Sequence, residues 1–395
     1  MRDFDDSDSS GSSVNRRRFL AAAAATGVTT VAGCLNSGSD STDTTEPTDS
    51  ETGGGELGSV GSGMEGRPAP GGTPMSEMPD LSGTLTLYSG RGKPLVNTLI
   101  EYIEGLYDGF TINTRYDSSN ALANKITTAG AATEADVLFS VNAGALGLLA
   151  NENRTVALPQ DVQEMVPTQY RNNDGEWTGT SGRARTIPYN TNAYSESEIP
   201  DDIFAFPDFD GSMGWAPGYG SFQAFVTAMR VMNGREETKQ WLQGMLDAGV
   251  ERYPDEFIVS RAVANGDLDA GFANHYYIQR VLDGNEDAPI ATAFTNNDAG
   301  AIFNVAGAAV VDTSENGDQT AENRQTAVNF VRHLLSAEAQ EYFATRTFEY
   351  PVIPEVNPVG DLPPVDELNT PDFDLAKLSD IGPTIDLMRE VGIQV

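Results

Sequence analysis

The sequence contains one cysteine and two histidines. Cys34 is the only cysteine among 395 residues, which excludes an intrachain disulfide and a cysteine-based metal cluster. His275 and His333 are the only histidines, and neither a Gly-x-Ser-x-Gly nor a His-Glu-x-x-His motif occurs, so histidine-based nucleophilic or zinc catalysis has little basis. Paired-carboxylate catalysis stays open in so acidic a chain, and an exported hydrolase is therefore the alternative from the enzyme class.

Basic residues are also scarce. Lys plus Arg number 24 against 58 Asp plus Glu, which gives a formal net charge of −34 at pH 7. The apolar content is still that of a folded protein, so the acidic excess indicates a hydrated surface rather than disorder. Such a surface suggests a halophilic protein, because screening in a high-salt medium weakens its self-repulsion. The lack of a basic face argues against a nucleic-acid partner.

The N-terminal 34 residues have the organisation of a signal peptide. Arg16-Arg17-x-Phe19-Leu20 resembles a twin-arginine export motif and precedes an apolar run that is too short, and too rich in Ala, Thr and Gly, to span a membrane. Val31-Ala32-Gly33-Cys34 resembles a lipobox. We therefore expect residues 1–34 to be a signal peptide with lipobox, and a lipid on Cys34 to anchor the exported protein to the outer face of the cell membrane.

Residues 35–81 consist almost entirely of Ser, Thr, Gly, Asp, Glu and Pro. Such a composition cannot bury enough apolar surface to fold. This segment is therefore predicted to be a disordered acidic tether.

After residue 81, strands and helices alternate. The pattern predicts strands at 84–88, 110–115 and 136–139, with helices at 95–106, 119–128 and 143–150. Further helices are expected at 222–232, 236–245, 257–264, 321–335, 337–345 and 385–391. The alternation predicts α/β lobes with mostly parallel sheets, whose ligands lie at the carboxyl ends of the strands. Segments that cross more than once between two lobes, such as 181–190, would place a cleft between them.

Tyr276 and Tyr277 are the foremost candidates for a binding site. They follow an apolar run at 268–273 that is expected to be a strand, and the residues after them can start a helix. At such a turn two neighbouring side chains can converge on one point. Two phenolates form a hard, anionic oxygen site that suits ferric iron. The alternative is that both tyrosines are half-buried packing residues.

A helix opening at 218–221 is a second candidate, because a turn of small residues leaves backbone N–H groups free to bind an anion. Many such turns bind only water. The turn at 218–221 therefore indicates an anion site only together with other binding residues.

Eight short segments follow one another along the chain: Leu85-Thr86-Leu87-Tyr88-Ser89-Gly90-Arg91, Ala135-Asp136-Val137, Ser181-Gly182-Arg183-x-Arg185, Gly220-Ser221-Phe222, Ala262-Val263-x-x-Gly266, Asn274-x-Tyr276-Tyr277, Gly307-Ala308-Ala309-Val310 and Glu349-Tyr350-Pro351. In this order they resemble the ferric-iron-binding proteins of ABC importers, which have the type II periplasmic-binding-protein fold shared by the transferrin lobe. The resemblance covers residues 82–395 and implies lobe 1 at 82–182 plus 303–358, lobe 2 at 183–302 plus 359–395, hinge crossings and a ligand cleft between the lobes.

The resemblance implies three tyrosine ligands for Fe³⁺: Tyr276, Tyr277 and Tyr189. A trivalent cation can remove a phenol proton at neutral pH even though the unperturbed pKa of tyrosine is about 10. Some members of the family add a histidine and a glutamate, but Gly92 and Val141 stand at the matching positions, so these two ligands are not carried over.

The resemblance also implies a carbonate or phosphate beside the iron. Arg183 and Arg91 would balance its charge, with ion pairing as the alternative role of both, and hydrogen bonds would come from Gly220, Ser221 and Asn274. Tyr88 or Tyr219 could add to the site. His275 is expected to be structural rather than a ligand.

The expected protein is a monomeric receptor and not an enzyme. It would close by a hinge motion on ferric iron and deliver it to an ABC permease with its ATPase. The alternative receptor takes an oxyanion or a small organic acid.

Overall fold

The computed structural model describes residues 67–313 and 321–395. Its first three strands are parallel, and β1 lies between β2 and β3. The helices between them bury one apolar face each, and α3 begins where Ser118 accepts a hydrogen bond from the Ala121 amide at 3.2 Å. These elements confirm the predicted alternation: β1 (Gly83–Ser89), α2 (Lys93–Gly105), β2 (Phe110–Tyr116), α3 (Ser119–Ala129), β3 (Val137–Ser140) and α4 (Ala143–Asn151).

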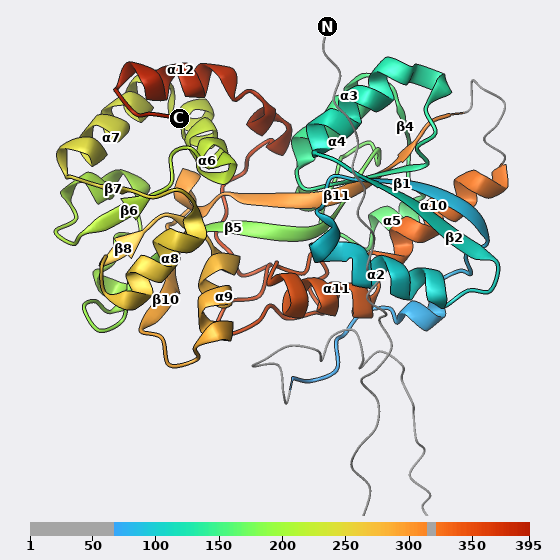
Figure 1. The fold of residues 1–395 in the computed structure, drawn as a ribbon, viewed down its shortest axis with the longest axis horizontal. Helices are drawn as coiled ribbons and strands as arrows, with labels where there is room; N and C mark the ends of the chain where they lie inside the picture. The colour runs from blue at the N-terminus through green and yellow to red at the C-terminus, as the bar shows by residue number, and fades with distance from the viewer. Residues whose placement is uncertain (1–66, 314–320) are drawn as a thin grey trace, which may run out of the picture. The chain divides into compact units, whose positions relative to one another are not determined.

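Two long antiparallel strands join this sheet to a second one. β11 (Phe303–Val311) pairs with β3 and with the first half of β5 (Thr178–Asn190). The second half of β5 pairs with β10 (Ile290–Ala293), β9 (Ala273–Asn274) and β8 (Ala270–Gly271). β5 therefore belongs to both sheets, and Figure 1 shows it running beside β11 between them. The prediction of mostly parallel sheets did not include these antiparallel strands.

The second sheet continues with parallel strands and is covered by helices. β6 (Met213–Trp215) lies between β7 (Glu251–Arg252) and β8. The apolar run at 268–273 forms the short β8 and β9 rather than one continuous strand. The covering helices are α6 (Gly220–Asn233), α7 (Arg235–Asp247), α8 (Glu256–Asn265) and α9 (His275–Gly284).

An aromatic cluster packs α6 and α7 onto this sheet. The ring of Trp241 lies 5.5 Å from that of Phe225 and 5.8 Å from that of Phe272, and Trp215 lies 5.3 Å from Phe222. Each of these side chains is almost fully buried. Burial of one such ring contributes roughly 2 kcal/mol of stability, so the cluster holds the N-terminus of α6 firmly in place.

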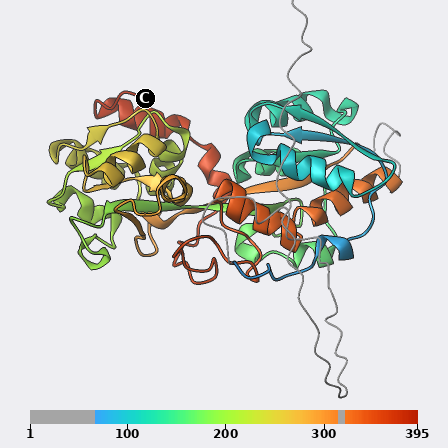
Figure 2. The same ribbon diagram turned by 60° about the horizontal axis from the view of Figure 1, so that its bottom comes forward.

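The C-terminal segment packs on both sheets. α10 (Ala321–His333) contacts β1 and β11, and α12 (Gly382–Glu390), predicted at 385–391, packs beside α6 and α7 in both views (Figures 1 and 2). The 3-10 helix η9 (Leu375–Ser379) contacts α4 and α6. Other elements include β4 (Thr155–Val156), α5 (Gln160–Gln163), α11 (Ala337–Tyr342) and a π-helical turn, η8 (Phe343–Thr347).

Residues 67–81 differ from the predicted tether, because they pack against the folded domain. Arg67 makes two hydrogen bonds of 2.8 Å to the Glu341 carboxylate. Met75, in the 3-10 helix η1 (Met75–Glu77), and Leu81 are each 2% exposed. Few apolar side chains suffice here because each enters an existing core.

Candidate functional site

Tyr276 and Tyr277 lie in the first turn of α9, directly after β9. This confirms the prediction of a strand-to-helix turn, and the two ring centroids are 4.3 Å apart. His275 starts the helix and is fully buried, with its Nδ1 3.2 Å from the Ala184 amide that donates to it. Burial lowers the pKa of His275 to about 4, which keeps the imidazole neutral.

A cavity of about 420 Å³ opens beside Tyr276, with residues of both sheets around it. Asn142 and Asn120 face it from the first helices, whereas Arg183 and Asn304 face it from the two linking strands. On the other side its lining residues are Tyr219, Gly220, Ser221, Asn274 and Tyr276. Five of the eight residues that the sequence analysis named for the site therefore line one cavity, whereas Tyr277, Tyr189 and Arg91 do not line it.

Tyr219 completes a group of three phenols. Its hydroxyl lies 2.5 Å from that of Tyr277, and Asn274 Nδ2 donates to the Tyr276 hydroxyl at 3.2 Å. Burial is the largest cause that raises the pKa of both Tyr276 and Tyr277, although the positive charge of Arg183 opposes it at Tyr276. These two phenols therefore hold their protons at neutral pH unless a cation displaces them.

The start of α6 lies at the same cavity. Tyr219 is the N-cap residue of this helix and its side chain makes no capping hydrogen bond, so amides of the first turn remain available to an anion. The Ser221 hydroxyl donates to Glu256 Oε1 at 2.5 Å. Arg183 donates to the Val141 carbonyl oxygen, while its buried Nε has no hydrogen-bond partner in the described part of the chain.

A buried carboxylate beneath the cavity was missed by the sequence reasoning. Glu256 is completely buried, pairs with Arg185 and accepts from the Asn274 amide at 3.0 Å. It thereby ties Arg185 on β5 to the start of α6 and to the residue before α9. The motif Gly182-Arg183-x-Arg185 contained this arginine, but its partner lies 71 residues further along the chain and has no local signal.

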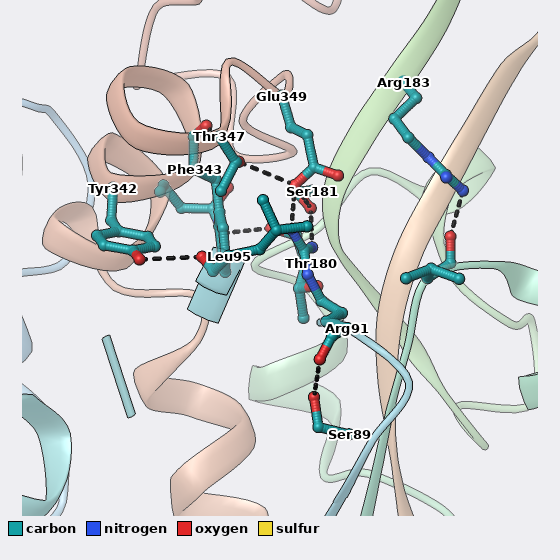
Figure 3. A network of polar contacts seen from close by, with 12 residues as sticks. Ser89, Arg91, Leu95, Thr180, Ser181, Arg183, Tyr342, Phe343, Thr347 and Glu349 are labelled. Atoms are coloured by element: carbon teal, nitrogen blue, oxygen red, sulfur yellow. Dashed lines mark hydrogen bonds and ion pairs between the residues drawn. The ribbon is translucent and has the colours of Figure 1, made fainter. Parts of the chain in front are cut away.

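Arg91 does not reach the cavity. It is 1% exposed, pairs with Glu349 and donates to the Ser181 hydroxyl at 2.6 Å, as Figure 3 shows. Burial alone would raise the pKa of Glu349, but the charges of Arg91 and Arg183 outweigh it and lower the pKa. Of the two roles considered for Arg91, the structure shows the ion pair. Arg183 lies outside this hydrogen-bonded group in Figure 3.

The structure does not bring Tyr189 to the other tyrosines. It lines a separate cavity of about 730 Å³, opposite Ala291 of β10. Tyr189 lies six residues after Arg183 on β5, and it is not among the residues that line the cavity of Tyr276 and Tyr219. Tyr88 is also elsewhere, because its buried hydroxyl accepts from Arg115 at 3.1 Å.

Cys34 and the rest of the predicted signal peptide lie outside the described residues. Within residues 67–313 and 321–395, no helix is long and apolar enough to cross a membrane. Over the same ranges, no group of three or more His, Cys, Asp and Glu side chains could hold a metal ion.

The family of bacterial extracellular solute-binding proteins matches residues 132–377. Iron uptake protein A2 of Synechocystis is 31% identical over 333 residues, which are 79% of this chain and 91% of that protein.

Solved structures agree with this match. Iron-bound HitA from Pseudomonas aeruginosa is 27% identical with a TM-score of 0.66, over 79% of this chain and all of that one. The Trichodesmium protein IdiA (FutA), solved with iron and citrate, is 25% identical with a TM-score of 0.66 over the same shares. The predicted fold, two α/β lobes of the type II periplasmic-binding-protein class, is thereby confirmed. The chain belongs to the family of bacterial extracellular solute-binding proteins.

Proposed function

We propose that this protein captures ferric iron outside the cytoplasm and delivers it to an ABC permease with its ATPase. The observation that carries the proposal is the group of three phenols, in which the Tyr219 and Tyr277 hydroxyls are 2.5 Å apart and the Tyr276 ring lies 4.3 Å from that of Tyr277. Phenolate oxygens are hard, anionic ligands that suit a small trivalent cation. The relatives named for iron uptake or solved with iron support the same cargo.

Tyr219 takes the place that the resemblance had given to Tyr189. It lies at the N-terminus of α6, next to the backbone amides that would hold an anion. Three phenolates would neutralise the charge of Fe³⁺, so an anion that fills the remaining coordination positions would need a positive partner from the protein. Arg183 supplies this charge, with Gly220, Ser221 and Asn274 at the same cavity.

The anion would be carbonate, phosphate or a carboxylate chelate that arrives with the iron. The Trichodesmium structure contains iron together with citrate, which supports the third possibility. The cavity of about 420 Å³ has room for such an anion beside the metal.

The test is a titration of the purified protein in high salt with ferric citrate, followed by the visible charge-transfer band of iron phenolate. We expect the band to saturate at one iron per protein and to be lost or shifted in Tyr276→Phe and Tyr277→Phe. Tyr194→Phe is the matched control, since Tyr194 is paired with Asp210 outside the cavity. A folded protein that gives no band would refute the proposal and direct attention to oxyanions and small organic acids.

The anchoring and the lobe boundaries also belong to the proposal. We propose that Cys34 carries a lipid after twin-arginine export. Mass spectrometry of the mature N-terminus would test this modification. Lobe 1 at 82–182 plus 303–358 and lobe 2 at 183–302 plus 359–395 are supported by the change of strand partners along β5. The protein would act as a monomer, and its own acidic surface would be adapted to high salt.

A further inference from the structure

The cavity that contains Tyr189 has a strongly acidic opening. It measures about 730 Å³, and no lysine or arginine lines it. Four carboxylates surround it: Glu196, Asp283, Glu286 and Asp361. Glu196, Glu286 and Asp361 are exposed, and none of the three forms an ion pair with a described residue. A cation that enters this cavity would therefore meet uncompensated negative charge.

Two buried polar side chains in the wall have no protein partner. Tyr189 is 6% exposed and Gln279 is 7% exposed, and both line the cavity. Neither the Tyr189 hydroxyl nor the Gln279 amide makes a hydrogen bond to another described residue. Both side chains face the cavity, so their polar atoms are available to a bound molecule.

Most of the remaining wall is apolar or aromatic. Phe294, Phe348 and the Tyr189 ring line the cavity together with Leu282 and Val359. Aromatic faces attract ammonium groups, and the volume is that of a site for a whole small molecule rather than a single ion. The carboxylates come from three segments of the chain, near residues 196, 283–286 and 361, which suits a ligand of some length.

We propose that this cavity is a second binding site, which takes a small organic ammonium compound. The aromatic walls hold its cationic group, the carboxylates at the opening neutralise it, and Tyr189 and Gln279 bind its polar part. Burial, together with the negative charge of Glu196, raises the pKa of Tyr189. The phenol is therefore neutral at physiological pH and can donate as well as accept a hydrogen bond.

The site shares a wall with the phenol cavity. Tyr276 packs against Phe348 and Val359, which line the second cavity, and Gln279 stands one turn after Tyr276 on α9. A molecule that contacts Phe348 is therefore expected to change the affinity for iron, and iron to change the affinity for that molecule by the same factor. This coupling rests on the proposed iron site, whereas the cation site does not.

The first experiment is calorimetric titration of the iron-free full-length protein with choline and with spermidine. The neutral control is 3,3-dimethylbutan-1-ol, which has the shape of choline without its charge. We expect at least one of the two cations to bind at one equivalent, and the neutral analogue to bind at least about tenfold more weakly. Equal binding of choline and its neutral analogue, or no binding of either cation, overturns the proposal.

Variants place the binding in this cavity. The double variant Glu196→Gln/Asp361→Asn should weaken cation binding about tenfold, and Tyr189→Phe about threefold. The control is Glu101→Gln, an exposed acid on α2 outside the cavity, which should have no effect. Unchanged binding in the double variant, with the fold intact by circular dichroism, also overturns the proposal.

The coupling between cation binding and iron binding is measured by repeating the ferric citrate titration with and without a saturating amount of the cation. We expect the apparent iron affinity to change at least about threefold in wild type and not in the double variant. An unchanged iron affinity would refute the coupling alone. Absence of any iron band would refute the proposed function while leaving the cation titration interpretable.

Discussion

The hydroxyl of Tyr219, at the N-terminus of α6, lies 2.5 Å from the hydroxyl of Tyr277, in the first turn of α9. Two helix starts that are far apart in the chain thus bring two phenols into direct contact. A metal that binds both oxygens would replace the shared proton.

Tyr219→Phe should weaken iron binding at least about tenfold and shift the charge-transfer band, because one anionic oxygen ligand is removed. Tyr189→Phe should leave both the band and the affinity unchanged, since this residue lines the other cavity. Both variants are compared with wild type in the same ferric citrate titration. The reverse result would restore Tyr189 as the third ligand and remove Tyr219 from the site.

Iron affinity should rise with pH. Burial raises the pKa of Tyr276 and Tyr277 above the ordinary value of 10.0, so both phenols are protonated before iron binds. Each phenol that becomes a ligand releases one proton, and the apparent association constant should increase about tenfold per pH unit for each proton released. Calorimetry in two buffers with different heats of ionisation counts these protons.

Tyr219→Phe should release one proton fewer than wild type in that measurement. An affinity that stays constant between about pH 6 and pH 8 would show that the phenols are not ionised by the metal.

Arg91→Met should destabilise the fold by about 3 kcal/mol, because it leaves the largely buried Glu349 carboxylate without its main partner. The companion variant Glu349→Gln/Arg91→Met should recover part of this loss. Urea unfolding measures both. A stability equal to wild type in Arg91→Met would mean that solvent or Arg183 compensates Glu349.

Arg183→Met is the matched variant at the cavity. It should lower the dependence of iron binding on added carbonate or phosphate, since the proposed counter-charge is lost. Arg91→Met, where folded, should retain that dependence.

A chain that begins at Ser82 should be less stable than one that begins at Arg67 by at least about 3 kcal/mol, because the buried side chains of Met75 and Leu81 would be missing from the core. Arg67→Ala alone should cost about 1 kcal/mol, as the Glu341 pair is only partly buried. The midpoints of urea unfolding give the comparison. Equal midpoints would support the prediction that residues 67–81 belong to a disordered tether.

The sequence determined the local elements of this protein well. Apolar periodicity located the strands and helices of the first lobe, and the apolar run before Tyr276 with helix-forming residues after it located the turn. These features depend on side chains that are neighbours along the chain. The motif Asn274-x-Tyr276-Tyr277 likewise consists of neighbouring residues, and its resemblance to the family's motif indicated iron binding by the two tyrosines.

Only the tertiary structure decided which distant residues meet. The sequence does not show which of Tyr189 and Tyr219 lies beside Tyr277. In the folded protein Tyr189 lies on β5 opposite β10, whereas Tyr219, at the start of α6, contacts the Tyr277 hydroxyl. Arg183 and Arg91 were both predicted to balance the anion, but in the folded protein Arg91 pairs with Glu349, which lies 258 residues further along the chain. Such choices depend on the register of β5 and on the packing of its neighbours, which residues distant in the chain determine together.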